Sequence, residues 1–223
     1  TGGYVVSNFF SQQQTSHVLA YLDGLPPATV AVTAIPQAHL VTGDYHDISA
    51  VVFDANFNAR GAERFFHVPG PQSLAIAGET TAPDITTISS SPYVRLRAEA
   101  DRPTPDGGAL FMEYVQSGST SETVVAVTET RLYHASSGDW RTDIPDLSAV
   151  AGWQNAWGLQ PGGAPIEWTS IVYGGRAELL FGAPPEDGEG LPFATFSSSP
   201  ATAQAFVTGR PFVRRPRPFG PAR

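Results

Sequence analysis

One short segment of the sequence combines residue types that bind metal ions. Asp44, Tyr45, His46 and Asp47 follow one another directly. In an extended chain alternate side chains project to the same side, so Asp44 and His46 would share one face and Asp47 would point away. A carboxylate and an imidazole are ordinary ligands of divalent cations. Since a polar turn between strands has the same composition, we expect a turn and keep Asp44 and His46 only as candidate metal ligands.

Several common enzyme mechanisms are excluded because the residue types they need are missing. The chain contains no Cys and no Lys, and all thirteen basic residues are Arg. This excludes thiolate metal sites, cysteine nucleophiles, Schiff-base lysines and the P-loop lysine. The Gly-x-Ser-x-Gly turn of a serine hydrolase is also absent. We therefore expect a protein that is not an enzyme and that carries no cofactor.

Carboxylates are harder to dismiss, because two of them facing each other could act as acid and base on a glycoside. The sequence does not show which of them face each other. Exposed positions on strands are the simpler interpretation. The glutamates in strand-like contexts are Glu99, Glu113, Glu122, Glu129, Glu167 and Glu178.

All four tryptophans lie within a short part of the chain, between residues 140 and 168. Their flat rings suit stacking on a sugar or anchoring a protein contact, and filling a core is the alternative. Trp153 and Trp157 belong to a long connection rich in Gly and Pro, where interaction surfaces are commonly built. The candidate contact residues are Trp140, Trp153, Trp157 and Trp168.

The C-terminal arm differs in charge from the rest of the chain. Residues 190–223 contain five arginines and no acid, whereas residues 1–189 set eight arginines against 21 acidic residues, a net charge of −13. An acidic body disfavours nucleic-acid binding except through the arm. Its many prolines predict an extended conformation, and we expect it to reach a neighbouring subunit or an acidic surface. The candidate contact residues of the arm are Arg210, Phe212, Arg214, Arg215, Arg217 and Phe219.

Composition and periodicity predict an all-β fold. The 223 residues include 22 Gly and 20 Pro, too many for a helical protein. The clearest strand is residues 93–100, and we predict a hairpin with residues 109–115. One short helical excursion is expected after Asp146. The other predicted strands are residues 4–10, 29–35, 50–53, 64–68, 74–77, 122–133, 166–173, 176–181 and 203–208.

Collinear matches between the two halves predict an internal duplication. Val-Ala-Val-Thr at residues 30–33 recurs at 125–128, and Ser-Ser-Ser-Pro at 89–92 recurs at 197–200. The offset between the halves only grows along the chain, as insertions into a second copy would cause. We therefore predict two tandem or pseudo-twofold related units of β-sandwich or jelly-roll type, followed by the arm. The predicted boundaries are residues 1–108, 109–209 and 210–223.

Together these features favour a structural or assembly module on a surface or particle, such as a coat, capsid protrusion, spike or appendage subunit. We expect it to bind copies of itself or other subunits, outside the cell or on a virion. Because the chain begins at Thr1, we also expect a processed product or part of a longer chain. No apolar run is long enough for a membrane span.

Two alternatives stay open. The first is a secreted carbohydrate-binding or glycoside-cleaving β-protein that uses the tryptophans and the strand carboxylates. The second is a metal-dependent β-barrel enzyme built around Asp44 and His46.

Overall fold

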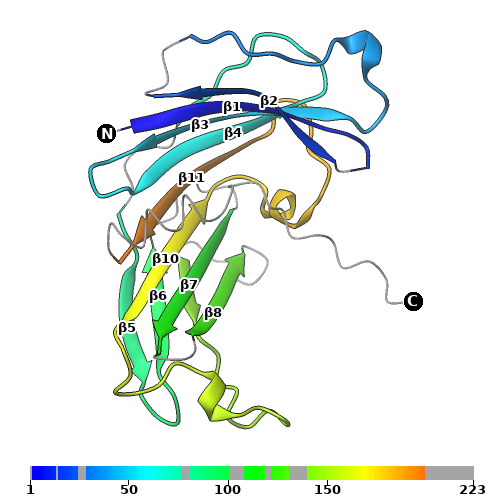
Figure 1. Ribbon diagram of the computed structural model, residues 1–223. Helices are drawn as coiled ribbons and strands as arrows, with labels where there is room; N and C mark the ends of the chain where they lie inside the picture. The colour runs from blue at the N-terminus through cyan, green and yellow to red at the C-terminus, as the bar shows by residue number, and fades with distance from the viewer. Residues whose placement is uncertain are drawn as a thin grey trace.

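The computed structural model is all-β and contains two antiparallel sheets (Figure 1). It describes residues 2–13, 15–24, 29–76, 81–100, 108–118, 122–130 and 140–198, with only the backbone at 127–130, 177 and 181. The strands are β1 (Gly2–Phe10), β2 (Ser16–Asp23), β3 (Tyr45–Phe53), β4 (Ala59–Phe66), β5 (Asp84–Ser89), β6 (Arg95–Ala100), β7 (Ala109–Ser117), β8 (Glu122–Thr130), β9 (Trp140–Asp143), β10 (Ile166–Tyr173) and β11 (Gly190–Ser197). Three short 3-10 helices complete the described elements: η1 (Gln37–His39), η2 (Asn155–Trp157) and η3 (Ala177–Phe181).

The larger sheet has eight strands in the order β2-β1-β3-β4-β11-β10-β7-β8. The sheet divides into two halves, β2-β1-β3-β4 and β8-β7-β10-β11, and each half consists of two hairpins. From the outer edge inward, each half starts with the second strand of its first hairpin, continues with the first strand of that hairpin, and ends with the second hairpin in chain order. The halves meet where β4 pairs with β11. The sheet twists so strongly that β7 and β8 run steeply across the direction of β1 and β3 (Figure 1).

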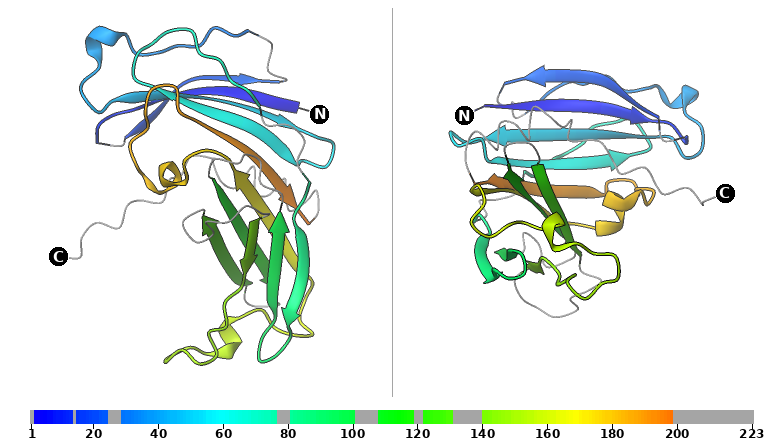
Figure 2. Two further views of the ribbon diagram at one scale, coloured as in Figure 1. Left: turned by 180° about the vertical axis from the view of Figure 1, so that it is seen from behind. Right: turned by 60° about the horizontal axis from the view of Figure 1, so that its bottom comes forward.

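The smaller sheet, β5-β6-β9, packs against the half of the large sheet that contains β7 and β10. Seen from behind, β5 and β6 lie in front of those strands (Figure 2). Leu96 and Ala98 of β6 meet Leu110 and Met112 of β7 in the largest core cluster. The alternation predicted for residues 93–100 is confirmed, because Leu96 and Ala98 are buried while Glu99 is exposed.

The same face of the other half is covered without a second sheet. Alternation along the paired strands places Val5, Ile48, Ala50 and Phe66 on the face that also carries Leu110. Two extended segments, residues 29–35 and 71–76, lie over these four residues. They contribute Val30, Val32, Leu74 and Ile76 to the cluster.

Several sequence predictions are confirmed and others are wrong. Residues 4–10, 109–115 and 166–173 lie within strands, whereas residues 29–35 form a covering segment and residues 176–181 contain η3. The predicted hairpin between 93–100 and 109–115 is wrong. Strand β6 pairs with β5 and β9, and β7 pairs with β8 and β10, because each hydrophobic face is buried against the other sheet.

The helical excursion after Asp146 is a turn followed by the single 3-10 turn of η2. The Asp146 carboxylate accepts the backbone N–H of Ser148 at 3.0 Å, so the predicted capping role is present without an α-helix. Strands β2, β5, β9 and β11 were not predicted. Residues 203–208 and the arm lie outside the described residues.

The predicted duplication is not confirmed. Residues 30–33 belong to a covering segment, whereas their match, residues 125–128, lies in edge strand β8. Ser89 lies in β5, at the edge of the small sheet, and its match Ser197 lies in β11, inside the large one. The boundary at residue 108 stays a prediction, although β6 and β9, from either side of it, share one sheet.

Gly61 shows how tightly the two halves are joined. A Cβ atom built at Gly61 would lie 2.5 Å from Cζ of Phe193 on β11 and 2.7 Å from the carbonyl oxygen of Ala50 on β3. The aromatic ring of Phe193 thus uses the space that a larger residue would occupy. Residues around it form a second core on the opposite face of the sheet, made of Val51, Ala59, Ile171 and Phe193.

Replacing Gly61 with Ala is expected to destabilise the protein. The new methyl group meets a backbone oxygen and an aromatic ring, so the strands must shift at a cost of about 1–3 kcal/mol. Urea denaturation measures the change. Gly70→Ala is the matched control, because nothing lies within 4 Å of a Cβ atom built there. Equal stability losses in the two variants would contradict the packing argument.

Candidate functional site

The segment that suggested a metal site is used for structure. The Asp44 carboxylate accepts backbone N–H groups from Gln12 at 2.8 Å and Val41 at 3.0 Å. Nε2 of His46 accepts the backbone N–H of Ile35 at 3.0 Å. Oxygen and nitrogen atoms that would bind a cation therefore accept backbone hydrogen bonds. Across the part of the chain that the structure describes, no group of three or more His, Asp or Glu residues is placed to hold a metal.

His46 lies fully buried among aromatic rings. Its ring stacks on Phe66 with centroids 5.2 Å apart and contacts Phe9 at 5.5 Å. Burial lowers the pKa of His46 below its ordinary value, although Asp44 and Asp47 act in the opposite direction. A neutral imidazole can accept the Ile35 hydrogen bond at Nε2, and a protonated one cannot. Neutral His46 therefore anchors residues 29–35 to the sheet.

Acidification is expected to destabilise the fold through His46. Because the folded-state pKa lies below the unfolded value of 6.5, the unfolded chain takes up the proton first. The stability from this group is complete above pH 6.5 and is lost as pH falls toward the folded-state pKa. Urea denaturation at a series of pH values measures the slope of the free energy of unfolding against pH.

His46→Gln should flatten this slope, and His39→Gln is the control because His39 is exposed. Identical slopes in the wild-type protein and His46→Gln would refute the anchor role.

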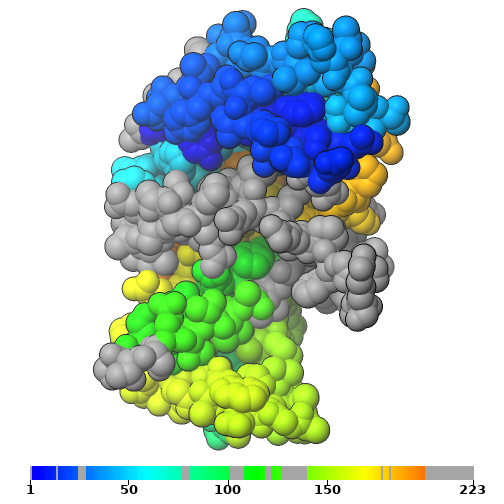
Figure 3. Space-filling model, turned by 45° about the vertical axis from the view of Figure 1, so that its right-hand side comes forward, coloured from blue at the N-terminus to red at the C-terminus, as the bar shows by residue number. Residues whose placement is uncertain are grey.

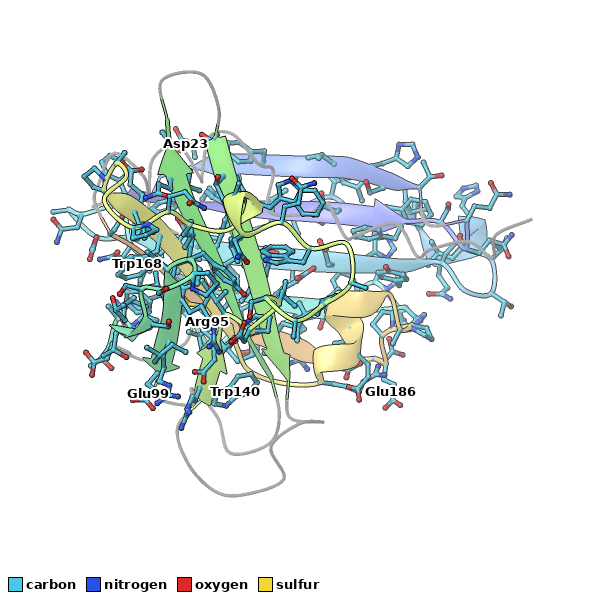
Figure 4. The ribbon with its side chains drawn as sticks, turned by 90° about the horizontal axis from the view of Figure 1, so that it is seen from below. Asp23, Arg95, Glu99, Trp140, Trp168 and Glu186 are labelled. Atoms are coloured by element: carbon cyan, nitrogen blue, oxygen red, sulfur yellow. The ribbon has the colours of Figure 1, made fainter. Side chains whose placement is uncertain are left out.

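Two of the four tryptophans lie on strands and two in a loop, and all except Trp157 belong to or pack against the core. Trp140 and Trp168 belong to or pack against the cluster between the two sheets (Figure 4). Trp153 lies on Tyr93, with ring centroids 5.6 Å apart, and meets Trp157 edge to face at 5.7 Å. Trp157 is 54% exposed. Of the four tryptophans, Trp157 is thus the most open to a ligand.

The connection between β9 and β10, residues 144–165, is held to the sheets by side chains. The Tyr93 hydroxyl donates to the carbonyl of Pro145 at 2.9 Å and accepts the N–H of Leu147 at 2.6 Å. The buried Gln116 amide donates to the carbonyls of Gln160 at 3.0 Å and Ala164 at 2.9 Å. It also accepts the N–H of Gln160 at 2.7 Å. The loop is therefore positioned by β7 and by Tyr93, which precedes β6.

From residue 147 onward, this loop forms an uncharged surface at one end of the molecule. Residues 147–166 contain no Asp, Glu, Lys, Arg or His. Val150 and Trp157 are its exposed large apolar side chains. Figure 3 shows the yellow-green atoms of this region at the end opposite the blue strands β1 and β2.

Removing the Gln116 amide is expected to loosen this loop. Gln116→Ala deletes three hydrogen bonds and leaves loop backbone groups without partners, a loss of about 1–3 kcal/mol. Hydrogen exchange of the Gln160 amide should accelerate. Gln154→Ala, at an exposed position of the same loop, is the control. Unchanged exchange in Gln116→Ala would show that the loop is held by its other contacts.

The strand register shows which carboxylates share a face. Glu113 on β7 and Glu167 on β10 are diagonal neighbours, because Glu113 pairs with Thr169 and Glu167 with Val115. Trp168, next to Glu167, points to the opposite face, into the core. The core tryptophans and these two carboxylates therefore lie on different faces, and a combined sugar site of that kind is not formed.

The small sheet carries an ion-pair network on its outer face. Arg97 binds Asp143 on the neighbouring strand through two contacts, at 2.8 and 2.9 Å, and Arg141 approaches the same carboxylate at 3.3 Å. The hydrogen bond from Arg97 is the main reason that the pKa of Asp143 is lowered to about 2. Figure 4 shows Arg95 and Glu99 on this sheet. The Asp143 carboxylate has a structural role, because its contacts with Arg97 link β6 to β9.

The outer edge of the large sheet is the most unusual surface. Strand β2 is the last strand at that edge, and Val18 and Tyr21 are 67% and 58% exposed. Leu22 is also exposed. The strand contains no Pro but has a bulge, and both a Pro and a bulge commonly protect an edge from pairing with another chain.

Sequence reasoning missed β2 because its side chains do not alternate regularly. Its pairing with β1 shifts register between Ser7 and Asn8, so Leu19 forms a bulge. The bulge places Val18 and Tyr21 on the same face although they are three residues apart. A scan that allowed one extra residue in the alternation could have found the strand.

The opposite edge of the sheet is β8, and there Val124 is exposed while Val125 packs against the core. The candidate contact residues of the arm, 210–219, lie outside the described residues.

Comparisons with known proteins found no relative of this chain. The chain matches no protein-family model, no curated protein and no solved structure. Within the described ranges, no helix is long and apolar enough to cross a lipid bilayer.

Proposed function

We propose that this protein is a non-enzymatic assembly module that acts through protein–protein contacts. It would serve as a subunit of a coat, capsid protrusion, spike or appendage, outside the cell or on a particle surface. The observation that carries the proposal is the open edge at β2, where exposed apolar side chains accompany a row of backbone groups at the end of the sheet. Large exposed apolar residues on an edge strand are typical of a surface that pairs with another chain.

The chemistry of the polar residues supports a structural role. Asp44 and His46 accept backbone hydrogen bonds, Asp143 is bound by Arg97 and Arg141, and Gln116 holds a loop. Each of these groups has its role in the fold. The uncharged loop at residues 147–166 offers a second contact surface at the opposite end of the molecule.

A duplicated origin of the two halves of the sheet belongs to the same proposal. It is supported by the repeated order of two hairpins, β2-β1-β3-β4 and β8-β7-β10-β11. The sequence matches do not support it, because one aligns a covering segment with β8 and the other aligns an edge strand of the small sheet with a strand inside the large sheet. A repeated unit would suit a protein that acts through the shape of its surface and not through catalysis.

Association of the full-length chain tests the function. Analytical ultracentrifugation over a concentration series should show species larger than the monomer, and electron microscopy should show them as defined particles. Chain that stays monomeric up to about 1 mM, the range of very weak association, would overturn the proposal.

Carbohydrate binding is the second candidate function, and the exposed ring of Trp157 favours it. Trp153 packs against this indole edge to face, and Trp157 is still 54% exposed. If it binds sugars, tryptophan fluorescence should respond to members of a glycan panel, and Trp157→Ala should abolish the response. Val150→Ala in the same loop is the control. Silence across the panel would remove this candidate.

A further inference from the structure

We infer that strand β2 pairs with β2 of a second copy, antiparallel, so that two eight-stranded sheets become one continuous sheet. This inference rests on the proposed assembly function and names its partner. The edge offers backbone groups for hydrogen bonds, which give affinity, and exposed side chains, which give specificity. A second copy is the occupant that the sequence of β2 itself favours.

The faces of β2 restrict the possible registers. Its pairing with β1 places His17, Ala20 and Leu22 on the face of Val5, and Val18, Tyr21 and Asp23 on the face of Tyr4. In an antiparallel pair, opposite residues must lie on the same face. Pairing Val18 with Tyr21 of the second copy satisfies this condition and also places His17 opposite Leu22 and Ser16 opposite Asp23.

This register uses the whole strand and compensates for its irregularity. Leu19, the bulged residue, falls opposite Ala20 of the second copy, and the reverse contact follows from two-fold symmetry. The two bulges lie side by side, so neither strand has an extra residue without an opposite. Shifting the register by one residue would place Val18, Tyr21 and Leu22 against side chains of the wrong face.

Charge and hydrophobicity agree with the same register. Asp23, the only acidic residue of β2, lies opposite a serine, and no like charges oppose each other. Val18 and Tyr21 are the two most exposed apolar side chains of the strand. Each would contact the other in the second copy, so the two-fold axis relates two such pairs. Pairs of aromatic and β-branched residues are favourable across antiparallel strands.

Disulfide trapping tests the pairing and its register in the full-length chain. The protein contains no cysteine, so any crosslink comes from the introduced residues. Val18→Cys/Tyr21→Cys should form a covalent dimer under mild oxidation. Each single variant should not, because neither residue lies opposite the same residue of the second copy. The control is Val41→Cys/Val68→Cys, two exposed valines outside β2.

A charge at the edge provides a test without covalent chemistry. Val18→Lys should weaken the association by about tenfold, because two valine–tyrosine pairs are lost and a charge is placed at the edge. Val41→Lys, at an exposed valine in a loop, should leave it unchanged. Sedimentation velocity measures both.

The outcomes separate this inference from the proposed function. Assembly that persists in Val18→Lys, with no crosslink in the double cysteine variant, overturns the β2 pairing and leaves the assembly function standing. Crosslinking of a single cysteine variant as efficient as that of the double variant overturns the register. A wild-type chain that never associates overturns the pairing and the function together.

Discussion

The pairing of β4 with β11 is the interaction on which the remainder of the fold depends. These strands come from distant parts of the chain, and each belongs to a separate pair of hairpins. Their ladder is reinforced by Oγ1 of Thr195, which accepts the N–H of Ala59 at 3.1 Å. Gly61 lets the ring of Phe193 approach the backbone. Among the described residues the two halves join in this sheet at this ladder, which creates one large face that carries the core clusters of both halves.

That face is covered in two physically different ways. The small sheet covers one half, and its backbone groups pair within the sheet. Residues 29–35 cover the other half without a ladder, so their backbone needs side-chain partners. Ser7 donates to the carbonyl of Thr33 at 3.2 Å, and His46 accepts from Ile35. Buried polar residues that resemble a reactive cluster in the sequence are thus explained by the backbone they satisfy.

The two surfaces on which the proposed function rests lie at opposite ends of the molecule. At one end, within the described residues, β2 is the last strand of the sheet, and its apolar side chains are exposed. At the other end, an uncharged loop is held in place by Tyr93 and Gln116. Neither surface concentrates charge or titratable groups. Under the proposed function, recognition at these surfaces would depend on shape and apolar contact.

The sequence alone determined the fold class, several strands and the buried face of β6, because these follow from composition and from alternation of neighbouring residues. It also indicated that Asp146 begins a turn. The contact surface that it suggested in the tryptophan-rich connection stays a prediction. It did not determine strand partners, and the hairpin of residues 93–100 with 109–115 was wrong for that reason. Which strands pair depends on which faces are buried together across the whole chain.

The tertiary structure alone decided the roles of the candidate site residues. His46 became an anchor because Ile35, eleven residues away, presents its N–H there. Trp140 entered the core while Trp157 remained exposed, although both are tryptophans of one short region. The edge at β2 was invisible in the sequence because a bulge interrupts its alternation. A local pattern records which residues can be buried, and long-range packing decides which of them are.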